Sequence, residues 1–170
     1  MDASLSHVSP ISDSLGDMST HPARYALLAA VVLSLTGCDD LRGFEGQWSG
    51  VRAGSAQPLL VGLSAQTTAR LVIDEATGDS FRARLTIGED VVREAAIQPI
   101  PGAEADALKH LSFDGSPARV YLAHAATNDG GGDLLLVISL HSEGRVELRA
   151  IRGGQAPIYA LFVLYRQSTP

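Results

Sequence analysis

Cysteine, lysine and methionine are nearly absent from this sequence of 170 residues, which has one cysteine, one lysine and two methionines. A single cysteine excludes an intramolecular disulfide, so a folded domain must be held together by its core. The single lysine, Lys109, does not follow the glycines of a GxxxxGK loop, which excludes that kind of phosphate site. No methionine follows Met18, which argues against a methionine-rich copper site.

Positive charge is also scarce, and the common local motifs of catalysis are missing. The formal net charge is −6. Nucleic-acid binding needs clustered lysine and arginine side chains against the phosphates, so we expect no nucleic-acid partner. The chain contains no GxSxG, SxxK or HExxH sequence. With no enzyme signature in the sequence, we predict a non-enzymatic protein with no catalytic residue and no cofactor.

The longest uncharged apolar run lies near the N-terminus. Tyr25–Leu35 comprises eleven apolar or small residues, too few to span a bilayer, which takes about 20, and Arg24 precedes it. Leu35-Thr36-Gly37-Cys38 follows. The charged flank, the apolar run and this tetrapeptide together resemble the signal peptide and lipobox of bacterial lipoproteins. The resemblance implies cleavage between Gly37 and Cys38, and palmitate-type acyl chains on Cys38 that hold the protein to a membrane.

The same resemblance divides the chain into a signal peptide (1–37), a lipidated N-terminus with a short tether (38–43) and a domain (44–170). The first 17 residues are polar and acidic, unlike the basic start of a signal peptide, so we predict that translation starts at Met18. The expected location is the bacterial cell envelope, with the domain facing the periplasm or the exterior. Asp39 and Asp40 resemble an inner-membrane retention signal of enteric bacteria. That rule is not general, so the choice between inner and outer membrane stays open.

Beyond the tether, apolar and polar residues alternate in short segments separated by turn residues. This pattern predicts about eight strands. The expected strands are 48–52, 69–74, 81–87, 91–98, 118–125, 134–141, 145–152 and 158–166. Their short connections favour antiparallel hairpins, so we predict an all-β domain, either a small antiparallel barrel or a β-sandwich. Residues 103–110 have acidic residues first and Lys109 and His110 last, which predicts one short mid-chain helix.

Gly46-Gln47-Trp48 opens the first expected strand, and Arg166 closes the last one. This arrangement resembles the calycin superfamily, which includes the lipocalins. In that superfamily a Gly-x-Trp begins strand one, and an arginine at the end of the final strand packs over the tryptophan. The resemblance implies a closed lipocalin-like barrel in which Trp48 and Arg166 form a closing pair. If the barrel is open inside, we expect an apolar ligand to contact the side chains of Phe81, Leu85, Leu136, Ile138 and Phe162.

Metal-ligating residue types are sparse and separated. Asn128, Asp129 and Asp133 offer three oxygen side chains in one glycine-rich loop, but their spacing is not that of an EF-hand. We therefore interpret the loop as a hairpin turn rather than a calcium site. The histidines of the domain, His110, His124 and His141, stand alone in the sequence, and we expect them at the surface.

Three functions remain open at this point. The first is an anchored envelope lipoprotein whose β-domain is an interaction or structural module that binds another envelope protein. The second is a lipocalin-like carrier of a small apolar ligand. The third is an enzyme whose catalytic site is assembled from residues far apart in the sequence. A cavity of several hundred cubic ångströms inside the barrel would favour the carrier, whereas a filled interior would favour the module.

Overall fold

The computed structural model describes residues 41–53, 62–142 and 144–168. The chain divides into two compact units, Met1–Cys38 and Asp39–Pro170, and the described residues all belong to the second unit. The predicted signal peptide, the start at Met18 and the lipidated Cys38 lie outside the described residues. Within the ranges that are described, no helix is both long and apolar enough to cross a membrane.

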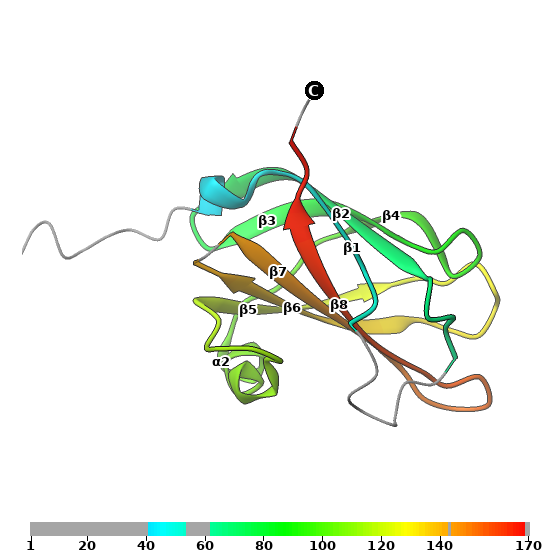
Figure 1. Ribbon diagram of the computed structural model, residues 1–170. Coiled ribbons are helices and arrows are strands. Elements are labelled where there is room, and N and C mark those ends of the chain that lie inside the picture. Colours follow the sequence, from blue (N-terminus) through cyan, green and yellow to red (C-terminus); the bar gives the residue numbers. More distant parts are fainter. Residues whose placement is uncertain (1–40, 54–61, 143, 169–170) are drawn as a thin grey trace, which may run out of the picture. The chain divides into compact units, whose positions relative to one another are not determined.

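The second unit is built from eight strands and three short helical segments (Figure 1). The strands are β1 Gly46–Val51, β2 Thr68–Thr77, β3 Ser80–Ile87, β4 Val92–Ile97, β5 Arg119–Ala125, β6 Leu134–His141, β7 Arg145–Arg152 and β8 Ile158–Arg166. A 3-10 helix, η1 (Leu41–Phe44), precedes β1, and helix α2 (Ala103–Asp106) and the 3-10 helix η2 (Lys109–Leu111) lie between β4 and β5. The predicted fold class, all-β with about eight strands and a short helical segment between the fourth and fifth strands, is confirmed.

The strands form one antiparallel sheet that curls into a nearly closed barrel. The order across the sheet is β4-β3-β2-β1-β8-β7-β6-β5, so the first and last strands of the chain are neighbours. Every pair along this order is antiparallel. Beyond β4, a single bridge joins Ile100 to Leu122 of β5. Of the two predicted architectures, the barrel is therefore correct.

Strict alternation places one face of each strand in the core. In β3, Phe81, Ala83, Leu85 and Ile87 are buried and the arginines between them are exposed. This happens because successive side chains of a strand point to opposite faces. The inward-facing side chains of all eight strands belong to one buried hydrophobic cluster.

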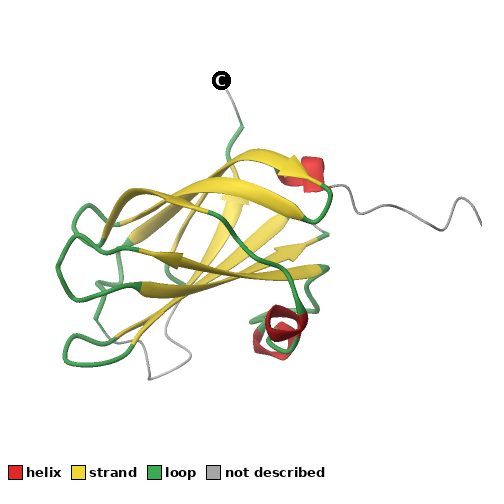
Figure 2. Cartoon of the chain, turned by 180° about the vertical axis from the view of Figure 1, so that it is seen from behind, coloured by secondary structure: helices red, strands yellow, loops and turns green. Residues whose placement is uncertain are grey.

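The β4–β5 connection covers part of the outer wall. In Figure 2 its short helices lie outside the strands. Ala105 of α2 packs with Val120 of β5 and Val137 of β6 in a second, smaller cluster. This contact explains why β6 is apolar on both faces, because the outer face of β6 is covered by protein rather than by water.

Candidate functional site

The predicted pair, Trp48 and Arg166, lies where the first and last strands of the chain meet. Trp48 and Arg166 are directly opposite each other in the β1–β8 ladder, and the guanidinium carbon of Arg166 lies 4.9 Å from the centre of the indole ring. Trp48 has no exposed surface, and its Nε1 donates to the carbonyl oxygen of Phe44 at 2.8 Å. Arg166 also donates to the carbonyl oxygen of Gly43. The last strand is thus joined to the segment before the first strand.

Helix η1 is part of this closure. Leu41 is 2% exposed and belongs to the core, and the Phe44 ring stacks on Trp48 with centroids 6.0 Å apart. Residues 41–43, predicted as tether, therefore belong to the folded unit.

The interior of the barrel is filled by side chains. Leu85, Leu136, Ile138 and Phe162, all predicted to contact a ligand, have 0% exposure, and Phe81 has 3%. A side chain next to a water-filled or empty chamber would keep accessible surface. These five instead belong to one packed core, and Phe81 makes an edge-to-face contact with Tyr121 at 4.9 Å.

A groove of about 660 Å³ lies outside the barrel, where the chain leaving β4 passes β5. The backbone N–H of Asn128 donates to the carbonyl of Val91, and Ile100 pairs with Leu122. Nine residue steps separate Val91 from Ile100 but six separate Leu122 from Asn128, so the two segments cannot keep a regular register between these contacts. The groove at this seam has apolar walls from Ile100, Pro101, Ala105 and Leu122, with Glu104 and His124 as ionisable groups.

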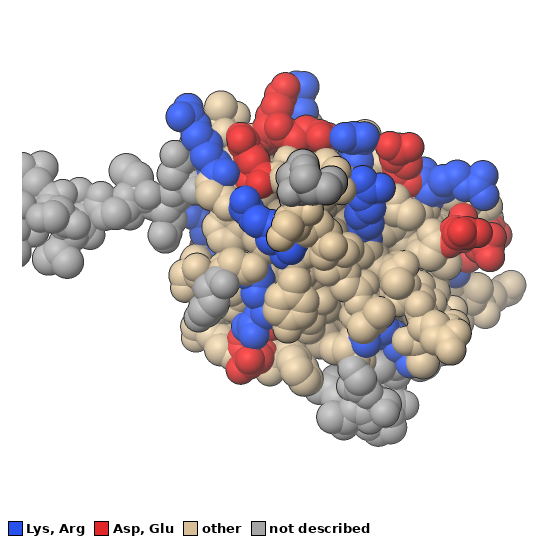
Figure 3. Space-filling view, turned by 45° about the horizontal axis from the view of Figure 1, so that its top comes forward, with Lys and Arg blue, Asp and Glu red and all other residues tan. Residues whose placement is uncertain are grey.

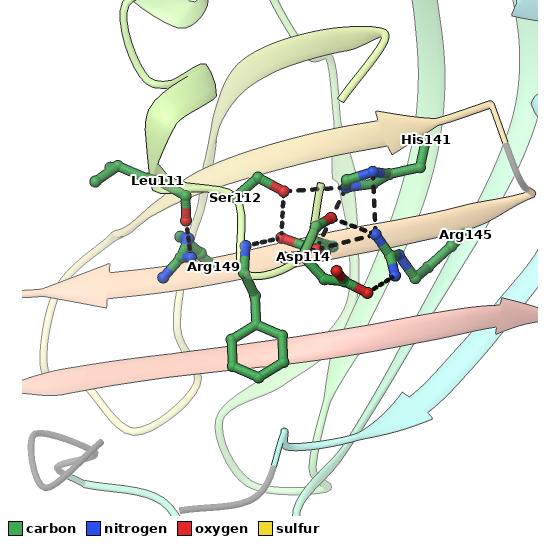
Figure 4. Close-up of polar contacts among 8 residues, drawn as sticks. Leu111, Ser112, Asp114, His141, Arg145 and Arg149 are labelled. Atoms are coloured by element: carbon green, nitrogen blue, oxygen red, sulfur yellow. Dashed lines mark hydrogen bonds and ion pairs between the residues drawn. The ribbon is translucent and has the colours of Figure 1, made fainter. Parts of the chain in front are cut away.

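A buried carboxylate holds the segment after η2 against the barrel wall (Figure 4). Glu147, on the outer face of β7, is 1% exposed. Its carboxylate accepts hydrogen bonds from the backbone N–H of Phe113 at 2.8 Å, the backbone N–H of Asp114 at 3.3 Å, and Ser112 Oγ at 3.1 Å. One side chain thereby fixes three consecutive residues of the β4–β5 connection.

His141 and Arg145 extend this network. His141 Nε2 lies 3.3 Å from both Ser112 Oγ and Glu147 Oε1, and Nδ1 lies 3.2 Å from Arg145 Nη2. Because a guanidinium can only donate, Nδ1 must accept, and we assign the ring proton to Nε2. In a Ser–His–acid triad the serine and the acid contact opposite ring nitrogens. Here both contact Nε2, so Ser112, His141 and Glu147 lack the geometry of an activated nucleophile.

Two arginines complete the attachment and leave apolar side chains outside. Arg145 donates to the carboxylate of Asp114 at 2.9 Å and to its carbonyl at 2.5 Å. Arg149 is 7% exposed and donates to the carbonyl of Leu111. Leu111 and Phe113 are nevertheless 37% and 50% exposed. The network therefore holds the backbone of this segment on the barrel side, while these two side chains face solvent.

The glycine-rich loop with Asp129 contains an ion pair. Arg152 donates to both carboxylate oxygens of Asp129 at 2.8 Å. This hydrogen bond from Arg152, together with the backbone N–H of Gly131 and the Thr127 hydroxyl, holds the pKa of Asp129 well below its usual range. Arg152 thus occupies the carboxylate that a cation at Asn128, Asp129 and Asp133 would need. Among the residues with described positions, no three His, Cys, Asp or Glu side chains are close enough to hold a metal.

The histidines do not share one environment. His110 Nδ1 lies 2.7 Å from the carbonyl oxygen of Ala107, and His124 is exposed at the groove. The prediction that all three are at the surface is wrong for His141, which is 1% exposed. His141 is on the outer face of β6, but the segment around Ser112 covers it.

Sequence reasoning missed the network of Glu147, His141 and Arg145. Glu147 and Arg149 alternate with apolar residues in the usual pattern of a half-exposed strand. The available signal was the neighbouring strand, 134–141, whose apolar residues on both faces require a cover on the outside as well.

Comparisons with protein-family models, curated proteins and solved structures found no match. The fold is therefore defined by the strand order and register of this barrel alone. The likeness to calycins rests on that order and on the pair formed by Trp48 and Arg166.

Proposed function

We propose that this protein is a bacterial envelope lipoprotein, anchored by acyl chains on Cys38, whose barrel is a non-enzymatic interaction or structural module. The packed interior of the barrel is the observation that favours an interaction or structural module over a carrier of a small ligand. All five side chains expected to contact a ligand are 0–3% exposed within one core. A small barrel of eight strands can be filled by its own side chains, and this one is.

The start of the folded unit supports the anchor. Leu41 is already buried in the core and is three residues after Cys38. An extended chain covers about 3.3–3.6 Å per residue, so three residue steps can span no more than about 11 Å. Acylation of Cys38 would hold the barrel end with Trp48 and Arg166 close to the bilayer, because no long linker separates them.

The anchor can be tested in a bacterial host that expresses the full chain. Cells are fed an alkyne-tagged palmitate, and the purified protein is analysed by intact mass. We expect a labelled product that begins at residue 38 and carries diacylglycerol, and no label on the Cys38→Ala variant. A full-length protein with a free thiol would contradict the proposal.

A carrier of a small apolar ligand is a second candidate because the groove falls within the usual range for ligand sites, roughly 300–1,000 Å³. The probe N-phenyl-1-naphthylamine separates the two candidates. A filled module gives no saturable fluorescence increase. A carrier that uses the groove gives saturable binding that Leu122→Glu removes, whereas the control Val51→Glu leaves it unchanged. Val51 is 60% exposed and is not part of the groove.

A further inference from the structure

A bulge in β4 places two neighbouring charged side chains on the same face of the sheet. Leu85 pairs with Ala95 and Ile87 pairs with Val92, so Arg93 and Glu94 both stand opposite Thr86. Glu94 has a φ of 50°, the one non-glycine residue with positive φ in the described part of the chain. In a regular strand, alternation would point one of these two neighbours inward. With the bulge, Arg93 and Glu94 are both exposed on the outer wall.

The bulge forms one wall of a cleft of about 210 Å³ on the outer face of β2, β3 and β4. The cleft is lined by Arg70, Arg84 and Arg93, by Thr86 and Val72, and by Glu94, so that one carboxylate lies beside the three guanidinium groups. Figure 3 shows charged side chains of both signs gathered on this side of the barrel, next to an area without charge. Three guanidinium groups and a hydroxyl are hydrogen-bond donors that suit an oxyanion.

The three arginines of the cleft differ in their hydrogen-bond partners, which are carboxylates for Arg84 and uncharged oxygens for the other two. Arg84 donates twice to Asp74, at 2.9 and 3.0 Å, and once to Glu94 at 3.1 Å. The hydrogen bond from Arg84 lowers the pKa of Asp74, which therefore stays ionised. Arg84 is thus held in place by two carboxylates.

Arg70 and Arg93 contact uncharged oxygens instead. Arg70 donates to the Gln47 side-chain oxygen at 3.0 Å, and Arg93 reaches the carbonyl of Glu89 at 3.5 Å. No acidic side chain lies within ion-pair distance of either group in the described ranges. Arg70 and Arg93 therefore line the cleft without forming an ion pair of their own.

We propose that this cleft binds a phosphate group, with Arg70 and Arg93 as its main ligands and Thr86 as an additional donor. Arg84 supplies its remaining N–H groups from a position fixed by Asp74 and Glu94. Counting the three arginines against these two acids leaves one net positive charge, which suits a monoanion such as a phosphodiester. The phosphate group can belong to an anionic lipid headgroup or to a soluble molecule, and the chemistry of recognition is the same.

The test observes the arginine side chains directly. The full chain is labelled with ¹⁵N-arginine, and the Nε–H signals are recorded while inorganic phosphate is added in neutral detergent. We expect the Arg70 and Arg93 signals to shift and saturate together. The double variant Arg70→Gln/Arg93→Gln should bind at least tenfold more weakly, measured on the Arg84 signal. Arg82→Gln is the matched control, because Arg82 is an arginine on β3 that is 73% exposed, pairs with Glu75 and is not part of the cleft.

A second arm identifies the source of the phosphate. The full chain is placed in nanodiscs of neutral phosphatidylcholine or of phosphatidylcholine with phosphatidylglycerol, without added phosphate. Shifts of Arg70 and Arg93 in the anionic discs alone support a lipid headgroup, and shifts with soluble phosphate alone support a soluble ligand. Shifts that never saturate in either arm, or that are equally large at Arg82, would overturn the proposal. Urea unfolding of each variant, followed by Trp48 fluorescence, verifies that the barrel is intact.

Discussion

Replacing Glu147 by glutamine tests how the β4–β5 connection is held on the barrel. The side chain keeps its volume but loses its charge. Oε2 accepts from the N–H of Phe113 and from Ser112, while Oε1 accepts from the N–H of Asp114 and lies 3.3 Å from His141 Nε2. An amide converts one of these two oxygens into a donor. In either orientation, at least one backbone N–H then faces an NH₂ group instead of an acceptor.

The expected loss follows from these contacts. A buried donor left without a partner costs about 1–3 kcal/mol, and breaking a buried ion pair costs about 3–5 kcal/mol. Arg145 is not left uncompensated, because it is 19% exposed and keeps its ion pair with Asp114 at 2.9 Å. The sum therefore falls below that of a fully buried pair. We expect Glu147→Gln to lower the free energy of unfolding by about 2–4 kcal/mol.

Urea unfolding followed by the fluorescence of Trp48 measures this loss, because Trp48 is the single tryptophan and is fully buried. With a slope of about 2 kcal/mol per molar urea, the midpoint should fall by about 1–2 M. Glu75→Gln is the control, since Glu75 is 70% exposed and lies 3.8 Å from Arg82. It should change stability by about 0.5 kcal/mol at most. A loss below about 1 kcal/mol for Glu147→Gln would refute the argument, because each unsatisfied donor alone should cost that much.

Three further predictions concern other parts of the barrel. Arg166→Leu should cost about 1–2 kcal/mol in urea unfolding, because it removes the cation over Trp48 and a hydrogen bond to a backbone carbonyl. Gly50→Ala should cost about 1–3 kcal/mol in the same assay, since a Cβ at this position would lie 1.9 Å from the carbonyl oxygen of Val163. Asp129→Asn should make unfolding less dependent on pH on the acid side. Asp129 has a lowered pKa, so its contribution is present above its unfolded pKa of about 3.9 and is lost as the pH falls through the folded value.

Each of these three predictions has a matched control. Arg166→Lys keeps the charge but not the planar group that both stacks and donates, so it should recover less than half of the loss. Gly153→Ala should be tolerated, because nothing lies within 4 Å of a Cβ at that site. Asp133→Asn alters the other acid of the same loop and keeps the ion pair between Asp129 and Arg152. If a control and its partner behave alike, the named contact is not the cause.

The strands were predictable because local rules determine them. The last three observed strands have the predicted bounds, and each is preceded by a turn rich in glycine or acidic residues. Thr77 pairs with Ser80 across a turn in which Gly78 has a φ of 57°, a conformation that glycine adopts without strain. The predicted helix at 103–110 appears as two shorter pieces, 103–106 and 109–111, because so short a segment has little helical stability of its own.

The polar network and the arginine cleft were not predictable because both depend on distant or irregular contacts. Ser112 meets Glu147, 35 residues later in the chain, and no local pattern indicates that one covers the other. The cleft depends on the bulge at Glu94, which has no glycine to indicate it. In an uninterrupted strand over 91–98, alternation would point either Arg93 or Glu94 inward, and the cleft would lose one of its charged side chains.

The length of the β4–β5 connection is difficult to explain by folding alone. The strands β4 and β5 are antiparallel neighbours around the barrel, and two to five residues can join such a pair. The chain instead uses residues 98–118. Attaching this segment requires burying Glu147 and His141, which is costly for polar groups unless every partner is in place. Neither closure at Trp48 nor the packed interior depends on it, because both are made by other strands.

The β4–β5 connection is held by buried polar groups, and its exposed surface carries charged side chains as well as three large apolar ones. Ile100, Leu111 and Phe113 are 66%, 37% and 50% exposed, and all three belong to this segment. Precise binding needs side chains on a fixed backbone, and Glu147 fixes the backbone on either side of Phe113. The filled barrel offers no internal site over the described residues. Under the proposed module function, a protein partner is therefore expected to contact the 98–118 connection, where Leu111 and Phe113 are exposed on a backbone that Glu147 fixes.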